Sequence, residues 1–145
     1  MAEIGKWHTI DINTKPSEGY PNPVWYVNIT DQLREAVPSD LKAGVMHVFV
    51  PHTTATLIMN SGVDGTTLHD IRMMIERLVP TSGPFVHLHD GPQDAAGHLR
   101  IQFGTNSLAL PISDGKLDIS ISQGLYFLEF DGPRDRRVKF AIQEF

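Results

Sequence analysis

The clearest helical pattern in the chain lies between residues 64 and 80. Apolar residues recur there three and four positions apart, and they are Leu68, Ile71, Ile75, Leu78 and Val79. This spacing places them on one face of an α-helix, and Pro80 stops the helix because proline lacks the amide hydrogen that a helix needs. Thr67 and Asp70 have the spacing of a capping box, so we expect them to cap this helix.

Two further helices are predicted, one on each side of the first. A short helix follows Thr30, which we expect to be its N-cap, and Pro38 ends it. A longer helix runs from Asp94, its predicted N-cap, to Phe103, and Gly104 stands just past its end.

Alternating side chains and runs of β-branched residues predict strands elsewhere. In the segment 44–50, Met46, Val48 and Val50 share one apolar face, as alternate residues of a strand do. The predicted strands span residues 6–12, 24–29, 44–50, 54–59, 85–89, 108–112, 117–121, 125–130 and 138–142. Residues 13–23 hold three prolines and a glycine and predict a loop, and residues 113–116 predict a hairpin turn.

The order of these elements indicates the fold class. Strands and helices mix without regular alternation, and the chain from Ser107 onward predicts strands alone. This arrangement favours an α+β fold over a doubly wound α/β sheet. At 145 residues the chain is long enough to bury one core, so we expect a single domain over residues 1–145.

Composition narrows the chemistry that the chain can carry. It has no cysteine, which excludes disulfides, thiolate catalysis and iron–sulfur clusters and leaves His, Asp and Glu as strong metal ligands; seven histidines are present. The net charge of −5 argues against a nucleic-acid partner, because phosphate contacts need Lys and Arg. No apolar run reaches about 18 residues and the first residues lack signal-peptide features, so we expect no membrane partner and a cytoplasmic location.

The first candidate segment follows the strand 44–50. His52 falls on the core side of that strand, whereas His47 faces away. An imidazole at the end of a buried strand either hydrogen-bonds a backbone carbonyl or belongs to a site, and the segment alone leaves both interpretations open. Thr53 and Thr54 add hydroxyls that can hold a phosphate or a carboxylate.

The second candidate segment spans residues 87–98. His87 and His89 share one face of the predicted strand and can present two imidazoles to one metal ion. His98 lies one helical turn after Asp94, so both side chains can point to the same side. Imidazole and carboxylate suit Zn, Mn, Ni or Fe. The alternative interpretation is a polar loop with solvated histidines.

The third candidate segment runs from Glu129 to Arg137 and contains the turn Asp131-Gly132-Pro133. A carboxylate and a guanidinium in such a turn often form a bidentate structural pair. The other interpretation makes Arg134 a clamp for an anion.

In this order and spacing, the three segments resemble the YjbQ-like (UPF0047) family, from about Asn28 to the C-terminus. The matching elements are His52-Thr53-Thr54-Ala55, Asp64 with Leu78-Val79-Pro80, His87 to His98, Glu129 with Asp131-Gly132-Pro133-Arg134, and the single positions Asp70 and Gln123. The resemblance implies a mixed β-sheet with two to three helices, and a homotrimer with polar pockets between or near its subunits.

The resemblance also implies a function. The family is catalogued as a secondary thiamine-phosphate synthase, a weak activity. We therefore expect a metal-dependent enzyme that acts on a small anionic substrate, phosphorylated substrates included, and a divalent metal such as zinc. The implied metal ligands are His52, His87 and His98; the implied catalytic residues are Asp64, Asp94 and Gln123; the implied ligand-binding residues are Thr53, Thr54 and Arg134.

The chain departs from the family pattern at two positions. Ser61 stands where the family has Glu, and Ser122 stands where it has Trp. Because loss of a general acid or base typically removes about 10²–10⁴-fold in rate, we expect thiamine-phosphate synthesis to be very weak or absent. His89 is a candidate compensating ligand. These departures favour a second function, a catalytically degenerate trimer that binds metal or ligand. A third alternative is a polar trimer interface held by histidines without any ligand.

Overall fold

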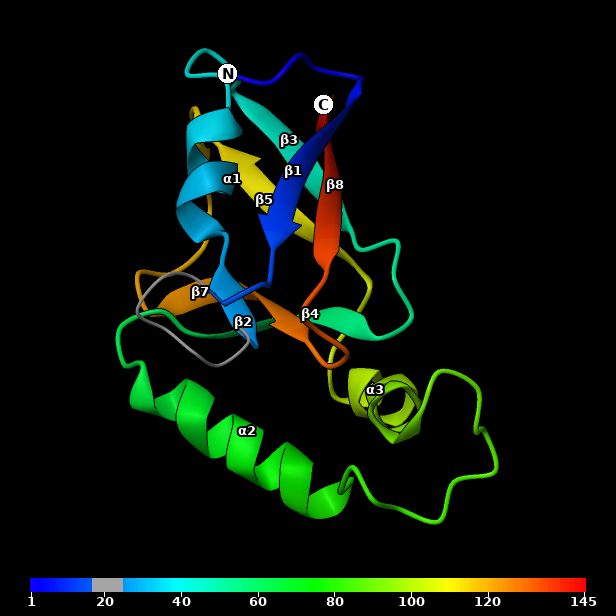
Figure 1. The fold of residues 1–145 in the computed structure, drawn as a ribbon. Helices are drawn as coiled ribbons and strands as arrows, with labels where there is room; N and C mark the ends of the chain where they lie inside the picture. The colour runs from blue at the N-terminus through cyan, green and yellow to red at the C-terminus, as the bar shows by residue number, and fades with distance from the viewer. Residues whose placement is uncertain (17–24) are drawn as a thin grey trace.

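The computed structural model describes residues 1–16 and 25–145 and contains two β-sheets and three α-helices within them (Figure 1). The strands are β1 (Trp7–Asn13), β2 (Tyr26–Asn28), β3 (Ala43–Phe49), β4 (Ala55–Ser61), β5 (Ser107–Ser113), β6 (Lys116–Leu117), β7 (Gln123–Glu129) and β8 (Asp135–Glu144). The helices are α1 (Thr30–Ala36), α2 (Thr66–Leu78) and α3 (Pro92–Arg100), and a 3₁₀ turn, Ile101–Phe103, extends α3. The predicted α+β class and the number of helices are confirmed.

The strands form a five-stranded sheet in the order β1-β8-β3-β5-β6 and a three-stranded sheet in the order β2-β7-β4. The predicted mixed sheet is wrong, because every strand pair in the described residues is antiparallel. A parallel pair needs a long crossover connection, usually a helix. Here the long helical connection through α2 and α3 leads from β4 to β5, which belong to different sheets.

Two of the short crossings between the sheets lie side by side. Residues 50–54 lead from β3 to β4, and residues 130–134 lead from β7 to β8. The backbone amide of Phe130 donates to the carbonyl of Thr54 at 3.0 Å, and this bond joins the two crossings. The first and third candidate segments therefore meet at one end of the molecule.

The main hydrophobic core lies between the two sheets. The face predicted for the segment 44–50 is confirmed, since Met46, Val48 and Val50 are buried. Strand β7 is buried on both faces: Leu125 and Phe127 belong to the main core. On the other face Tyr126, Leu128 and Phe130 pack with Leu68 and Ile75 of α2. Figure 1 shows the result as layers, with the three-stranded sheet between the larger sheet and the pair α2 and α3.

The predicted N-caps are wrong for all three helices. In α1 and α2, the first backbone amide of the helix donates to a side-chain oxygen two residues earlier. The amide of Thr30 donates to Asn28, and the amide of Thr66 donates to Asp64. This local turn starts α1 and α2 earlier than the predicted caps allow. Helix α3 begins at Pro92 after Gly91, whose φ of 91° few other residues adopt, so Asp94 lies inside the first turn.

Two predicted strands are absent or shortened. Residues 85–89 form no strand in the described structure, since no neighbouring strand offers them a ladder of hydrogen bonds. The strand predicted at 117–121 is reduced to β6, and Ile121 is 88% exposed. Of the predicted loop 13–23, Asn13 pairs with Asp135 as the end of β1, and residues 17–23 lie outside the described part. Among the described residues, no helix has the length and apolar content needed to cross a bilayer.

Candidate metal centre

Helix α3 lies directly against the two crossings because Gly97 allows a close approach. A Cβ atom at Gly97 would stand 3.2 Å from the side chain of Thr54 and 3.3 Å from the carbonyl oxygen of Phe130. The four residues of α3 that lead up to this contact, Asp94 to Gly97, are buried. The sequence therefore brings the first turns of α3, and the second candidate segment with them, to the end of the molecule where the other two segments meet.

Three side chains converge at this place. The Nε2 atom of His87 lies 3.0 Å from Oδ2 of Asp94, and Nε2 of His98 lies 3.1 Å from the same oxygen. The two imidazole rings are edge to face, with centroids 5.1 Å apart. Within the described residues, this is the group of histidines and carboxylates whose candidate ligand atoms all lie within 4.8 Å of one another. The structure thus joins two of the three predicted metal ligands to a predicted catalytic carboxylate.

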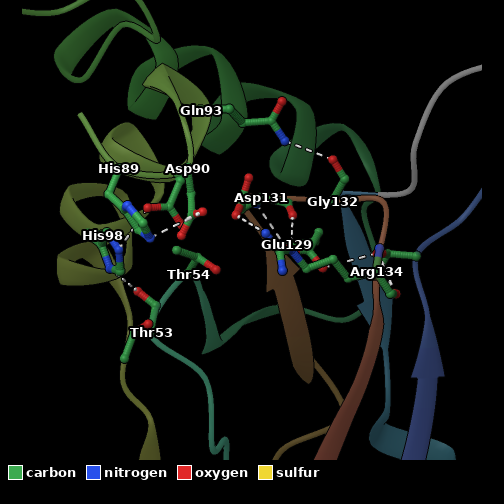
Figure 2. Close-up of polar contacts among 12 residues, drawn as sticks. Thr53, Thr54, His89, Asp90, Gln93, His98, Glu129, Asp131, Gly132 and Arg134 are labelled. Atoms are coloured by element: carbon green, nitrogen blue, oxygen red, sulfur yellow. Dashed lines mark hydrogen bonds and ion pairs between the residues drawn. The ribbon is translucent and has the colours of Figure 1, made fainter. Parts of the chain in front are cut away.

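The backbone carbonyl of Thr53 determines which nitrogen of the His98 ring carries the hydrogen. It lies 3.1 Å from Nδ1 of His98, and because a carbonyl only accepts, Nδ1 carries the hydrogen (Figure 2). In the neutral ring, Nε2 then presents a lone pair to an oxygen of Asp94 that also bears lone pairs. A positive centre between them, either a proton or a metal ion, removes that repulsion. A ring fixed through Nδ1 to a carbonyl is the usual arrangement of a metal-ligating histidine.

The charge of Asp94 is maintained by its neighbours. Burial acts to raise its pKa, but hydrogen bonds from His87 and Asp131 and the charges of the two imidazoles outweigh it, so the pKa of Asp94 is lowered. The pKa of Asp131 is raised, mainly by burial and in part by the carboxylate of Asp94, although Arg134 opposes the change. The neighbours of Asp94 therefore favour its ionised form, which is the form that binds a cation.

The donor set fits a divalent metal ion. Two imidazole nitrogens and one carboxylate oxygen leave a fourth tetrahedral position open, as catalytic zinc sites do. A cavity of about 530 Å³ adjoins the two imidazoles, and its lining is mainly apolar: Pro84, Phe85, Val86, His87, Ala95, His98 and Leu99. A bound ion would thus face a space large enough for a small molecule.

His52 and His89 do not belong to this group. The Nε2 atom of His52 accepts a hydrogen bond from the backbone amide of Arg137 at 3.0 Å, which corresponds to a structural role. Burial, and then the positive charge of Arg136, lower the pKa of His52. The predicted strand that aligned His89 with His87 is absent, and His89 is exposed to solvent beside Asp90.

Two of the predicted catalytic residues lie at the other end of the three-stranded sheet. The register of β4 and β7 pairs Ala55 with Glu129 at the end near His98, and Ser61 with Gln123 at the far end. Six residue steps separate the two pairs, or about 20 Å along the strands. There the side-chain oxygen of Gln123 accepts a hydrogen bond from the backbone amide of Ser120. Asp64 follows Ser61 closely, so within one chain neither residue reaches the three converging side chains.

Asp64 has a local role at the start of α2. Its carboxylate accepts hydrogen bonds from the hydroxyl and the amide of Thr66, and these bonds lower the pKa of Asp64. A carboxylate with a lowered pKa is a weaker general base. Ser122, at the same end of the sheet, has its hydroxyl 2.8 Å from the hydroxyl of Ser120.

Arg134 pairs with the carboxylate of Asp131, which agrees with the structural interpretation of the third segment. Arg134 donates to the carboxylate of Asp131 at 2.7 Å and to its carbonyl at 2.9 Å, so one side of the guanidinium is held in the turn. Figure 2 shows this pair beside Glu129 and the crossing. The hydroxyl of Thr54 accepts from Arg136, whereas Thr53 serves the site through its carbonyl.

A buried bidentate ion pair supports the crossings, and it is of the kind that one interpretation of the third segment predicted without naming the two residues. Arg136 donates to both carboxylate oxygens of Glu129, at 2.7 and 2.6 Å, and both side chains are almost fully buried. The hydroxyl of Thr14 also donates to Glu129, at 3.0 Å. One signal in the sequence was available: Glu129 interrupts a continuous apolar run, and a carboxylate buried in such a run requires a partner.

Comparison with known proteins gives one consistent result. A family model described as UPF0047 protein YjbQ-like matches residues 8–144. A UPF0047 protein of Archaeoglobus fulgidus is 42% identical over 113 residues, which cover 77% of this chain and 86% of the relative. The UPF0047 protein YjbQ of Escherichia coli O157:H7 is 31% identical over 103 residues, which cover 70% of this chain and 75% of that protein.

Solved structures agree in fold. A protein of Clostridium acetobutylicum, described as an uncharacterized conserved protein of the yjbq/upf0047 family, superposes with a TM-score of 0.79 at 30% identity and covers 93% of this chain and 98% of its own. A hypothetical protein of Aeropyrum pernix K1 reaches a TM-score of 0.83 at 26% identity, with 97% and 99% covered.

Proposed function

The chain belongs to the UPF0047 protein YjbQ-like family, and we propose that it is a divalent-metal-dependent enzyme acting on a small anionic substrate. His87, Asp94 and His98 would hold the ion. This assignment keeps two of the ligands predicted from the sequence and replaces His52 by Asp94, because the accepting nitrogen of His52 already faces the amide of Arg137.

One observation carries the proposal. Two imidazole nitrogens face a single buried carboxylate oxygen at 3.0 and 3.1 Å, while the other nitrogen of His98 is fixed by the carbonyl of Thr53. The neighbouring Asp131 also contributes to the lowered pKa of Asp94, which favours the charged form of this ligand. Ligands oriented in this way by a second layer of hydrogen bonds are typical of metal centres.

The protein's own residues supply the remaining chemistry. A divalent ion bound at this centre would act as a Lewis acid and lower the pKa of a coordinated water. The adjoining cavity is mainly apolar, while Arg134, with 51% of its side chain exposed, can attract an anion to this end of the molecule. The hydroxyl of Thr53 stands beside the carbonyl that orients His98 and is a candidate contact for the substrate.

Metal analysis tests the proposal. We expect protein purified without chelator to hold about one zinc or similar ion per chain by elemental analysis, and EDTA to remove it. Replacement by Co²⁺ should give the visible absorption of a four-coordinate nitrogen–oxygen site, which is a readout independent of activity. Protein that takes up no ion from stoichiometric Zn²⁺, Mn²⁺ or Co²⁺ would contradict the proposal.

A second candidate function is a catalytically degenerate protein that binds metal or ligand. The observations that favour it are Ser61 and Ser122, which replace the expected Glu and Trp, and the distance of Asp64 and Gln123 from the metal centre within one chain. Activity assays with and without EDTA separate the two functions. Thiamine-phosphate synthesis should be very weak or absent, and turnover of small phosphomonoesters that depends on the metal would favour the enzyme.

We also propose that the chain assembles as a homotrimer. Support comes from large apolar side chains left in solvent close to the metal centre, where Val86 is 99% and Leu88 80% exposed. Soluble monomers rarely expose clustered apolar surface of this kind. Subunit contacts there would also bring a neighbour's side chains near the open metal position.

A further inference from the structure

A second cavity lies on a different face of α3 from the candidate metal ligands. Its volume is about 360 Å³, and the residues that matter here are Trp25, Arg72, Thr81, Gln93, Arg100 and Phe130. Gln93 and Arg100 stand seven positions apart and share one side of the helix, whereas Asp94 and His98 share another. This cavity and the apolar cavity beside His98 have no lining residue in common.

The cavity contains a buried cation without an acidic partner. Arg100 is 7% exposed and uses its guanidinium to donate to the carbonyl of Val79, at 2.9 and 2.8 Å, and to the hydroxyl of Thr81 at 3.1 Å. No carboxylate in the part of the chain that the structure describes lies within ion-pair distance of it. Arginine is rarely buried unless it is paired. Burial lowers the pKa of Arg100, and Glu76 opposes this change only from longer range.

The other charges around the cavity are already balanced. Arg72 donates to Glu76 at 2.9 Å, and Glu129 is paired with Arg136, so each of these pairs is neutral. Arg100 is therefore the charge that a ligand would meet. Since Nε and Nη2 are engaged by Val79 and Thr81, Nη1 is the donor that the described structure leaves for an oxygen of a carboxylate or a phosphate, the groups that a guanidinium recognises.

The other residues that line the cavity suit the organic part of a ligand that carries the anionic group. Trp25 and Phe130 offer aromatic surface, and the guanidinium of Arg72 lies 5.6 Å from the ring centre of Trp25 and holds that ring in place. The amide of Gln93 is fixed by a hydrogen bond to the carbonyl of Gly132 at 2.8 Å (Figure 2). A volume of about 360 Å³ is at the lower end for small-molecule sites and accommodates a single small ring.

We propose that this cavity is a second binding site, independent of the metal centre, for a small aromatic oxyanion whose charge is neutralised by Arg100. The competing explanation is purely structural, because the bond from Arg100 to Val79 also anchors the end of α2 to α3. The two explanations differ in one respect: only the first requires the positive charge to be available to a solute.

Fluorescence of Trp25 tests the proposal directly. The chain has two tryptophans, so a Trp7→Phe background leaves Trp25, in the cavity wall, as the reporter. The probes are phenyl phosphate, benzoate and inorganic phosphate, titrated with EDTA present so that binding to a metal ion makes no contribution. Phenyl phosphate and benzoate distinguish the phosphate and carboxylate forms of the ligand, and inorganic phosphate shows whether the ring matters.

We expect a saturable change in Trp25 emission with phenyl phosphate or benzoate, and a weaker one with inorganic phosphate. Arg100→Met should weaken binding at least tenfold, whereas Arg77→Met, which removes the same charge from the exposed side of α2, should leave it within twofold. Absence of saturable binding, or equal affinity in Arg100→Met, would overturn the proposal. Should Arg100→Met fail to fold, Arg100→Gln decides: it keeps a polar side chain but removes the charge, so unchanged affinity for both organic probes contradicts the site.

Discussion

His98 makes the two contacts on which the candidate metal centre depends, one to Thr53 and one to Asp94. We predict that His98→Ala weakens Zn²⁺ binding by more than about 100-fold, the upper end of what loss of an outer-layer contact costs, because here a ligand itself is lost. Isothermal titration of chelator-treated protein with Zn²⁺ measures the effect.

His69→Ala is the matched control for this substitution. His69 is exposed on α2, with 72% of its side chain accessible, and lies outside the group of candidate ligands. Its replacement should leave the affinity for Zn²⁺ unchanged. Equal affinities of the His98→Ala and His69→Ala proteins would remove His98 from the centre.

His52 leads to a prediction about pH. Its pKa in the folded chain is lowered, by burial first and then by Arg136, so folding favours the neutral ring. The unfolded chain therefore binds this proton first as the pH falls, and stability depends on that difference. The stabilising contribution is complete above the ordinary value of 6.5 and is lost as the pH decreases from there through the lower folded value.

The measurement is urea unfolding at pH 8 and pH 5.5 for the natural chain and for His52→Gln, whose side-chain oxygen can still accept from Arg137. The natural chain should lose more free energy of unfolding between the two pH values than the variant does. Identical losses would show that His52 takes no part in the pH dependence.

At the scale of elements, the approach of α3 to the crossings depends on Gly97. A larger side chain there would collide with Thr54 and with the carbonyl of Phe130. We predict that Gly97→Val lowers the free energy of unfolding by about 1–3 kcal/mol through overpacking and weakens metal binding, since α3 also carries Asp94 and His98. Denaturant unfolding and metal titration measure the two effects.

Gly65→Ala provides the control, because Gly65 has ordinary helical dihedrals and no atom within 4 Å of a Cβ atom at that position. It should change stability by less than about 0.5 kcal/mol. A Gly97→Val protein as stable as the Gly65→Ala protein would show that α3 has room to move away from Thr54.

The ends of β7 and β8 are held together by Glu129 and Arg136. Removing one partner leaves a buried charge unpaired, so Arg136→Met should cost about 3–5 kcal/mol of stability. The double variant Glu129→Gln with Arg136→Met should recover part of that loss. Lys6→Met, which breaks an exposed pair with Glu3, should cost less than about 1 kcal/mol. Thermal and urea unfolding of the four proteins test this order.

Elements with a strong periodic or apolar pattern were predictable, and those that depend on distant partners were not. Helix α2 and strands β3 and β7 follow from apolar spacing, because each buries a face against the core. Residues 85–89 have strand-like composition, but no strand edge lies beside them to pair with. The strand predicted there from composition alone was therefore wrong. Asp94 was placed correctly near His98 by helical spacing, whereas the bond from His98 to the carbonyl of Thr53 depends on the way the crossings fold.

For the whole molecule, the proposed homotrimer leads to a direct measurement. Light scattering of purified protein at micromolar concentration should give three times the chain mass of 16.2 kDa. Val86→Asp and Leu88→Asp together should shift the mass toward one chain, because they place charges on the exposed apolar loop beside the metal centre. The matched control is Met73→Asp with Met74→Asp on α2. A monomer mass for the natural chain would contradict the assembly.

The separation of the site's parts along the chain has a consequence for how the protein is made. Thr53, Asp94 and Asp131 lie about 40 residues apart in sequence, and the ion pair that secures the crossings needs Arg136 as well. On a ribosome, a nascent chain that has exposed β3 and α3 still lacks the partner of Glu129. A metal centre built on these residues would therefore reach its final geometry only after β8 emerges, and we expect chains cut short before Arg136 to bind Zn²⁺ more weakly than the whole chain does.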